Sequence, residues 1–351
     1  MNRARIDGRR LDLRDGRIDL THGAGGRATA QLVAELFAPH FDRGDNVWLR
    51  QGNDQAIMPQ PDGRLALSTD CHVVTPLFFP GGDIGTLAVN GTVNDLAMGG
   101  ARPLYLSAGF ILEEGLPLAD LLRVVRSMAA AAETAGVHLV AGDTKVVERG
   151  KADGLFITTA GVGVVPDGVE LDGACARPGD AVIVSGTLGD HGMAILSQRE
   201  ALGLDSPIES DCAALNGLVA HMLEHCPSLR LLRDPTRGGL ANTLNELCQQ
   251  SGVGMRIDEV AVPVRPAVRA ACELFGLDPL YLANEGKLVA ACAATDADAL
   301  VKAMRSHPLG RDAVVIGEAC ADGHSFVRMA TLFGGERLLD WLHGEMLPRI
   351  C

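Results

Sequence analysis

Aromatic residues make up only 4% of this sequence of 351 residues, with 2 Trp, 2 Tyr and 9 Phe. The hydrophobic cores must therefore consist mainly of Leu, Val, Ile and Ala, for which a hydrophobic content of 47% is ample. The sequence also lacks an uninterrupted run of about 18 apolar residues, so it predicts no membrane span. Excess positive charge is absent as well. The net charge of −13 argues against nucleic acid or an anionic membrane as the main partner.

Cysteine pairs of the CxxC type are missing, although the sequence contains nine cysteines. No Cys/His group has the spacing of a zinc site, and most cysteines lie in apolar stretches, where they act as small hydrophobic residues. These features predict a cytoplasmic protein in a reducing compartment, with no structural metal. Residues 1–17 interleave Arg with Asp and lack an apolar core, so we expect a solvated leader and not a targeting signal.

The length and a change of pattern near Ala176–Asp180 predict two mixed α/β domains. We place the N-terminal domain at 18–172, the C-terminal domain at 173–343 and a flexible tail at 344–351. In the first domain, hydrophobic periodicity predicts helices at 27–38, 83–99 and 116–136 and strands at 65–69, 71–75, 104–111, 137–141 and 155–165. In the second it predicts helices at 190–201, 211–225, 239–251, 266–275 and 296–306 and strands at 181–184, 253–258, 287–293, 313–319 and 325–330.

The tail, Gly344–Cys351, ends on a thiol and shows neither helical nor strand periodicity. Pro348 favours an extended conformation for the residue before it. A terminal segment of this kind is mobile unless other residues hold it, and eight extended residues span roughly 25 Å. Cys351 is therefore either a thiol on a mobile arm or simply the residue on which this sequence ends. The segment taken alone favours the second interpretation.

Four aspartates lie in small or polar settings at the ends of strands or helices, namely Asp54, Asp70, Asp95 and Asp143. Carboxylates gathered around a nucleotide are the ligands that Mg²⁺ requires. Each of them alone is more simply explained as a helix-capping or strand-end residue. Because four occur in one predicted domain, a shared metal site is the functional hypothesis.

Polar residues follow one face of the predicted helix at 83–99, at spacings of three and four: Asp83, Thr86, Asn90 and Asn94. Polar side chains on an otherwise apolar helix need hydrogen-bond partners when they are buried. A ligand or a second subunit can supply these partners, or the face can be solvated. The sequence favours neither alternative.

Two glycine-rich turns precede predicted helices, at His22–Gly26 and at Asp234–Gly239. Free N–H groups at a helix N-terminus suit phosphate, and Arg237 adds positive charge. Neither turn matches a P-loop or a Rossmann fingerprint, so the spacing alone carries little weight. His191 opens a predicted helix and is expected to be a capping or supporting residue.

Lys145 and Glu285 stand beside glycines and apolar strands. Charged groups in such settings are candidates for a perturbed pKa and for proton transfer, although an ion pair is the commoner outcome. The residue types alone thus indicate a two-domain α/β protein that handles phosphate and carries a mobile thiol.

Taken together, these stretches resemble the HypE family of hydrogenase-maturation proteins. The resemblance runs in order from about Ile18 to Cys351, and leaves out the leader. It rests on HGAGG (22–26), STDCHVV (68–74), PLFFPGGDIGTLAVNGTVNDLA (76–97), GDTKVV (142–147), SGTLGDHG (185–192), DPTRGG (234–239), NEGKLV (284–289), HPLG (307–310) and PRIC (348–351). The terminal PRIC and GDTKVV are the most specific of these. Cys71 stands where the family often has Ser, which we interpret as neutral.

The resemblance implies a two-domain PurM-like fold of the α/β (α+β) type, from the aminoimidazole-ribonucleotide synthetase superfamily. It implies a homodimer whose N-terminal domains jointly form a β-barrel and bind ATP with Mg²⁺. It also implies the activity. A carbamoyl group loaded onto the C-terminal thiol by HypF is dehydrated, at the expense of ATP, to a thiocyanate. The cyanide then passes to iron on the HypC–HypD complex for the NiFe hydrogenase centre.

Roles for individual residues follow from the same resemblance. Cys351 would carry the substrate, and Glu285 and Lys145 would remove its protons. The nucleotide-binding set would be Gly23, Gly25, Gly26, Asn90, Asn94, Thr144, Asp234 and Arg237. The Mg²⁺ ligands would be Asp54, Asp70, Asp95 and Asp143.

Two alternatives remain at this point. The first is that the chain is another enzyme of the superfamily: selenophosphate synthetase, thiamine-monophosphate kinase or aminoimidazole-ribonucleotide synthetase. Residues 20–30 contain no Cys for a selenophosphate synthetase, and none of the three has a use for Cys351. The second alternative is a carbamoyl carrier or scaffold that binds nucleotide without catalysis. The carboxylates and Glu285 argue against it.

Overall fold

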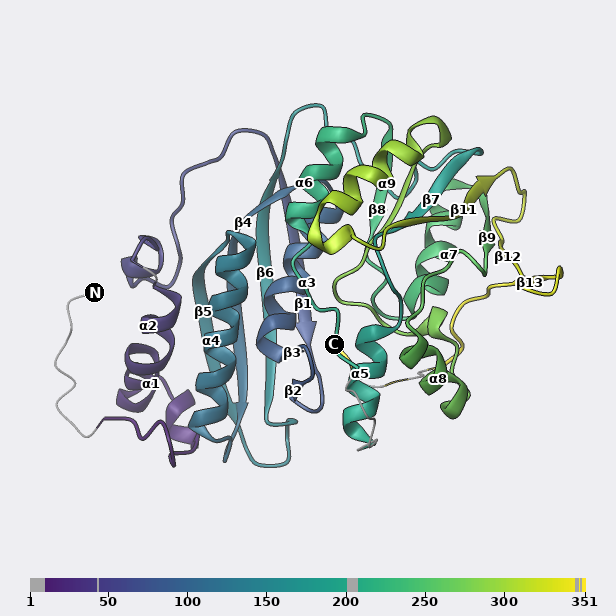
Figure 1. The fold of residues 1–351 in the computed structure, drawn as a ribbon. Coiled ribbons are helices and arrows are strands. Elements are labelled where there is room, and N and C mark those ends of the chain that lie inside the picture. Colours follow the sequence, from purple (N-terminus) through teal and green to yellow (C-terminus); the bar gives the residue numbers. More distant parts are fainter. Residues whose placement is uncertain (1–9, 43, 201–207, 345–346, 348) are drawn as a thin grey trace.

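Two β-sheets, one in each half of the chain, form the framework of the computed structural model (Figure 1). The structure describes residues 10–42, 44–200, 208–344, 347 and 349–351, so positions 1–9 of the predicted leader lie outside the described residues. No helix in this described part of the chain combines the length and the apolar character needed to cross a membrane.

The first sheet has four strands and is covered by helices on one face. Its spatial order is β1 (Arg64–His72), β6 (Leu155–Val165), β4 (Arg102–Glu113) and β5 (His138–Val147). Helices α3 (Ile84–Met98) and α4 (Leu118–Ala135) pack on one face, and α1 (Arg27–Leu32), a π-helical turn (Val33–Phe37) and α2 (Ala38–Phe41) lie beyond the β5 edge (Figure 1). The pair β2 (Phe78–Phe79) and β3 (Gly82–Asp83) leads into α3.

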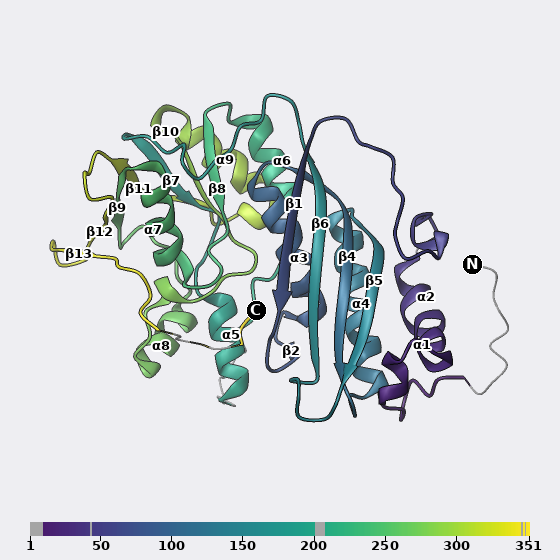
Figure 2. The same ribbon diagram turned by 180° about the vertical axis from the view of Figure 1, so that it is seen from behind.

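The other face of this sheet carries no helix from the described part of the chain (Figure 2). Alternation along β1 turns Leu65 and Leu67 toward this open face, where their side chains are 62% and 77% exposed. The alternate residues of β1, which include Asp70 and His72, point toward α3. A Cβ added to Gly91 of α3 would lie 3.0 Å from Asp70 Oδ2 and 2.9 Å from His72 Cε1. The two faces of the sheet therefore carry different sets of predicted site residues.

The second sheet has seven strands between two layers of helices. Its spatial order is β13 (Glu336–Leu338), β12 (Val327–Ala330), β9 (Gly254–Asp258), β11 (Val314–Cys320), β7 (Asp180–Val184), β10 (Val289–Ala293) and β8 (Leu229–Arg233). One face packs on α7 (Gly239–Ser251), and the other on α6 (Asn216–His225) and α9 (Ala297–Ser306). Helices α5 (Asp190–Arg199) and α8 (Pro266–Phe275) form a further apolar cluster beside this sheet.

Helix α4 shows how the sequence dictates an element. Its apolar residues recur at helical spacing and are buried at Leu121, Val124, Val125 and Met128, so one face joins the first core. Gly136 ends the helix with a φ of 72°, a conformation that glycine adopts at no steric cost. Helix α3 is buried nearly all round, because it lies between the first sheet and the C-terminal half of the chain.

Three sequence-based element predictions need correction. The strands expected at 65–69 and 71–75 are one strand, since β1 continues its pairing with β6 through Asp70. The helix expected at 211–225 begins only at Asn216, because tertiary hydrogen bonds hold 211–215 in a non-helical conformation. Strand β8 was not predicted, since its short run of Leu and Arg gave too little periodicity.

The polar face of α3 finds its partners within the chain. Asp83 caps the helix together with Thr86. Asn90 Nδ2 donates to Cys212 Sγ at 3.4 Å. Asn94 Nδ2 donates to the carbonyls of Ala213 (3.0 Å) and Glu285 (3.3 Å), and Asn94 Oδ1 accepts from the backbone N of Leu215 at 2.7 Å. The stripe thus joins α3 to the C-terminal half, and both amide hydrogens of Asn94 are already used.

Candidate active site

The last described residues pair with the chain just beyond the end of β1. Val74 and Ile350 make an antiparallel bridge, and the backbone N of Val73 donates to the main-chain O of Cys351 at 3.1 Å. The N of Thr75 donates to the carbonyl of Arg349 at 3.2 Å. The tail predicted to be flexible is therefore bound at its end in this structure. Residues 345–346 and 348 of that tail lie outside the described residues.

Side chains of α5 and of the loop between β5 and β6 also hold this segment. His191 Nε2 bonds the carbonyl of Ile350 at 2.8 Å, and Arg199 donates to the carbonyl of Arg349. The guanidinium of Arg349 bonds both carboxylate oxygens of Asp153, at 2.9 and 2.8 Å. The Ile350 side chain is buried in the core of the N-terminal half. His191 was expected to be a supporting residue, and here it supports the tail.

This docking places the Cys351 thiol beside the Glu285 carboxyl, close enough for each group to shift the pKa of the other. Burial raises the pKa of the Cys351 thiol well above its usual range, and the neighbouring Glu285 raises it further. Burial also raises the pKa of Glu285, which is 5% exposed, and the charges of Asp234 and Asp211 add to this effect. Glu285 Oε1 is buried without a hydrogen-bond partner among the described residues. A carboxyl with a raised pKa and an unused oxygen is well suited to accept a proton beside the thiol.

Three aspartates surround this pair. Ser68 Oγ donates to Asp95 Oδ2 at 2.6 Å, while burial and the charge of Asp70 raise the pKa of Asp95. Burial raises the pKa of Asp234 to about 7, and the charges of Asp95 and Asp70 contribute. Like charges held this close together in a partly buried place favour either protonation or a bound cation.

A cavity of about 470 Å³ opens beside the thiol. Arg237, Gly238, Asn242 and Tyr281 line it together with Cys351. The positive charge of Arg237 lowers the pKa of both Cys351 and Asp95, so it faces the thiol and the acidic group. At the start of α7 a Cβ on Gly239 would lie 2.5 Å from the carbonyl O of Leu282, so only glycine fits there.

Sequence reasoning missed three residues of this neighbourhood. His72 Nε2 lies 3.6 Å from Asp70 Oδ2, and strand alternation from Asp70 is the signal that points to it. Asp211 Oδ1 accepts from the backbone N of Glu285 at 3.1 Å, and Lys287 Nζ lies 3.2 Å from Asp211 Oδ2. Lys287 shares the NEGK segment with Glu285, whereas nothing in the sequence places Asp211 beside it.

A second group of predicted site residues gathers at β5. Asp143 and Lys145 are aligned with Gly109 and Ile111 of β4 on the open face, and Lys145 is 69% exposed. Since β1 and β5 are opposite edges of the sheet, this lysine lies three strands from Asp70 and on the other face.

The glycine-rich turn and Asp54 belong to this second group. A Cβ on Gly23 would lie 2.6 Å from the backbone N of Val146, so the turn that continues into Gly25 and Gly26 packs against β5. Asp54 is exposed in the bend after a 3₁₀ turn (Leu49–Gln51) that contacts β5. Within one chain, the structure thus brings Asp70, Asp95, Asp234, Arg237, Glu285 and Cys351 together, and it leaves the β5 group apart.

Comparison with known proteins identifies the family. The profiles "AIR synthase related protein, N-terminal domain" and "AIR synthase related protein, C-terminal domain" match residues 52–165 and 177–330. "Carbamoyl dehydratase HypE" of Cupriavidus necator is 67% identical over 344 residues, which cover 98% of this chain and 97% of that protein. The chain belongs to the HypE family.

Solved HypE structures agree with this assignment. The crystal structure of "Hydrogenase Maturation Protein HypE in complex with ATP" has a TM-score of 0.90 and 50% identity, and it covers 95% of this chain and 99% of that one. A "HypE-HypF complex" has a TM-score of 0.78 and 48% identity, and it covers 89% and 99%. The resemblance to HypE and the two-domain PurM-like α/β fold are confirmed, and the rival enzymes of the superfamily are disfavoured.

Proposed function

We propose that this chain is an ATP-dependent carbamoyl dehydratase that converts S-carbamoylated Cys351 into a thiocyanate for hydrogenase maturation in the cytoplasm. The observation that carries the proposal is the contact of the Cys351 thiol with the buried Glu285 carboxyl. A carrier or scaffold has no need for a base at its loaded thiol. The relatives named carbamoyl dehydratase HypE support the same activity.

The chemistry defines what the residues must do. Dehydration turns S–C(=O)–NH₂ into S–C≡N, so the carbon loses its oxygen and the nitrogen loses two protons. Phosphorylation by ATP lets that oxygen leave as phosphate, since an amide oxygen alone is a poor leaving group. Glu285 would take a proton from the nitrogen beside Cys351, because its carboxyl lies next to the thiol. Lys145 remains our candidate for the other proton.

The carboxylates fit a bound Mg²⁺ in part. Asp70 and Asp95 offer hard oxygen ligands, and the raised pKa of Asp95 and of Asp234 reflects a place where a cation is favourable. When bound, Mg²⁺ would neutralise charge on the transferring phosphoryl group. Asp54 and Asp143 lie near β5, so their part in this site would require residues from a second copy.

ATP would lie in the cavity beside Cys351. Its volume falls within the range of about 300–1,000 Å³ that is usual for ligand sites. Arg237 and the backbone at Gly238 would contact phosphate there. The other predicted nucleotide residues, Gly23, Gly25, Gly26 and Thr144, lie at β5, and Asn90 and Asn94 serve packing in this structure.

A homodimer would unite the two groups of residues. The open face of the first sheet presents Leu65 and Leu67 to solvent, an unusual exposure for large apolar side chains on a sheet face. Pairing two such faces would cover them and form the expected barrel. The cavity beside Cys351 reaches this face at Cys71 of β1, where residues of a second copy would meet it. We further propose HypF as the carbamoyl donor, as the HypE–HypF complex of a relative suggests, and HypC–HypD as the cyanide acceptor.

Intact-mass spectrometry tests the proposed activity. We expect Cys351 to gain a carbamoyl group from HypF and its substrates, and to lose one water only when Mg-ATP is present. Cys351→Ala is expected to gain nothing. A carbamoyl adduct that never loses water would mean that the protein is a carrier.

The acidic group predicts a pH dependence of stability. Asp234 has a folded-state pKa of about 7, above the unfolded value of about 3.9, so folding favours its protonated form. This contribution is complete below the unfolded pKa and is lost as the pH rises through about 7. We therefore expect the free energy of unfolding in urea to fall from pH 5 to pH 8 more steeply for wild type than for Asp234→Asn. The exposed Asp167→Asn is the matched control, and equal slopes for all three proteins would contradict the prediction.

A further inference from the structure

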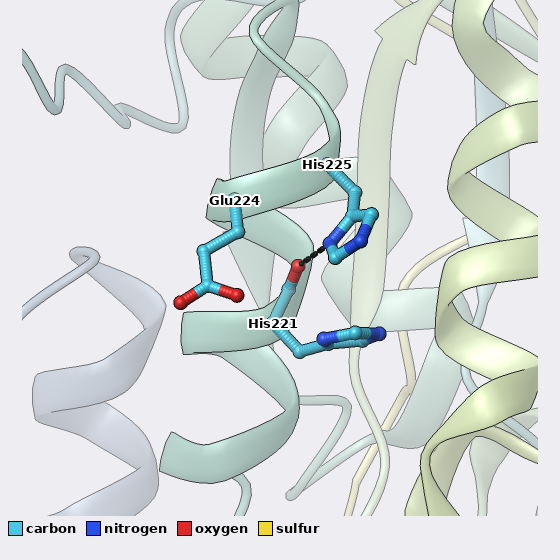
Figure 3. Close-up of side chains that lie close together, drawn as sticks. All are labelled: His221, Glu224 and His225. Atoms are coloured by element: carbon cyan, nitrogen blue, oxygen red, sulfur yellow. Dashed lines mark hydrogen bonds between the residues drawn. The ribbon is translucent and has the colours of Figure 1, made fainter.

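Helix α6 carries two histidines and a glutamate on one side, far from the thiol in the sequence and in the fold (Figures 1 and 3). His221, Glu224 and His225 stand at positions i, i+3 and i+4, which share one helix face. One potential ligand atom from each lies within 4.8 Å of the others. The spacing His-x-x-Glu-His contains no cysteine, so it differs from the Cys/His zinc patterns.

Hydrogen bonds fix the ring of His225 in a form ready to bind a metal. Its Nδ1 lies 2.8 Å from the carbonyl O of His221, as the dashed line in Figure 3 marks. A carbonyl only accepts, so Nδ1 carries the hydrogen in the neutral ring and Nε2 keeps a free lone pair. A backbone carbonyl that holds the second nitrogen is the usual support of a metal-binding histidine.

The ring of His221 is oriented by a different partner with the same result. Its Nε2 lies 3.0 Å from Ser306 Oγ, and that hydroxyl donates its own hydrogen to the carbonyl of Ala303 at 2.6 Å. His221 Nε2 is therefore the donor to Ser306, which leaves the lone pair on Nδ1. Ser306, at the end of α9, thus supports a ligand on α6.

His307 is a neighbour of this group and not a further ligand. Its ring centroid lies 6.5 Å from that of His221. Its Nδ1 accepts from the backbone N of Leu309 at 3.2 Å, so the hydrogen of the neutral ring is on Nε2, the nitrogen that faces Gly217 of α6.

Glu224 completes the donor set with a negative charge. Its side chain is exposed on the same helix as the two histidines. Two neutral imidazoles and one carboxylate are the protein ligands of many three-ligand zinc sites, in which water occupies the fourth position. His at i and i+4 on one helix is also the spacing of helical zinc-binding motifs.

We propose that the side chains of His221, Glu224 and His225 bind a transition-metal dication of the Zn²⁺ class on the surface of α6. The site is separate from the proposed Mg²⁺ site, whose ligands are all oxygens. Nitrogen ligands select Zn²⁺ and its neighbours over Mg²⁺.

Calorimetric titration of Zn²⁺ into the full, tag-free, metal-stripped chain tests the proposal. We expect wild type to bind one more Zn²⁺ per chain than His221→Gln/His225→Gln. Loss of a residue that only supports a metal ligand costs about 10–100-fold in metal affinity. Each single variant removes a ligand itself and should weaken Zn²⁺ binding by more than that. His324→Gln changes another exposed histidine and should bind as wild type does.

Co²⁺ absorption distinguishes this site from the cysteines of the chain. We expect the component lost in the double variant to lack thiolate-to-metal charge transfer, because its ligands are imidazole and carboxylate. Equal Zn²⁺ stoichiometry and affinity in wild type and the double variant would overturn the proposal. Carbamoyl dehydration should be the same in both proteins, so failure here leaves the proposed activity untouched.

Discussion

Glu285→Gln is expected to leave the loading of Cys351 intact and to slow its dehydration by about 10²–10⁴-fold, the usual contribution of a general base. Glutamine keeps the size of the side chain but cannot accept a proton from the carbamoyl nitrogen. The Glu285 carboxyl is suited to that task because burial and two acidic neighbours raise its pKa. Single-turnover intact-mass spectrometry follows both species on Cys351. The carbamoyl adduct should accumulate in the presence of Mg-ATP and lose water only slowly.

The controls separate loss of the base from damage to the fold. Glu170→Gln removes an exposed carboxylate and should dehydrate the adduct at the wild-type rate. Glu285→Asp retains a base on a shorter side chain and should recover part of the activity. Folding should not suffer in Glu285→Gln, since a neutral amide relieves the burial of a charge. Dehydration at the wild-type rate would show that another group removes the protons.

Local sequence patterns were enough to predict the elements whose structure is set locally. Helix α4 has a clear apolar face and a terminal glycine, so its extent followed from periodicity and Gly136. Residues 211–215 have a helix-compatible pattern, yet Asn94 and the backbone of Glu285 bind them in another conformation. Those partners are distant in sequence, so no local pattern reports them.

The same distinction applies to the candidate site. Residue types and the resemblance singled out Asp70, Asp95, Glu285 and Cys351, which the fold gathers. They gave no information on the order of the strands, which puts Lys145 at the far edge and on the other face of the sheet. A single sequence therefore identified the chemical groups and left open which of them meet within one chain.

Lys287→Met is expected to lower the free energy of unfolding by about 3–5 kcal/mol, the usual cost of breaking a buried ion pair from one side. Lys287 Nζ lies 3.2 Å from Asp211 Oδ2, and the two side chains are only 13% and 1% exposed. Removing the ammonium group leaves the Asp211 carboxylate buried without its counter-charge. Urea unfolding at pH 7 measures the loss. Lys302→Met, on an exposed face of α9, should change the free energy by less than about 0.5 kcal/mol.

The double variant Asp211→Asn/Lys287→Met shows whether charge is the cause. Replacing both members of a buried pair by neutral groups is often close to neutral, so we expect most of the lost stability to return. Asn keeps an oxygen that can accept from the backbone N of Glu285, as Asp211 does at 3.1 Å. The change of Asp211 to Asn also removes a negative charge that raises the pKa of Glu285. Since the base acts in its deprotonated form, the pH at which dehydration reaches half its maximum should fall. Stability that returns without this shift would mean that Asp211 serves only folding. Recovery of stability together with a lower half-maximal pH would show that the ion pair both positions Glu285 and raises its pKa. Those two roles would explain why two charges are buried directly behind the proposed base.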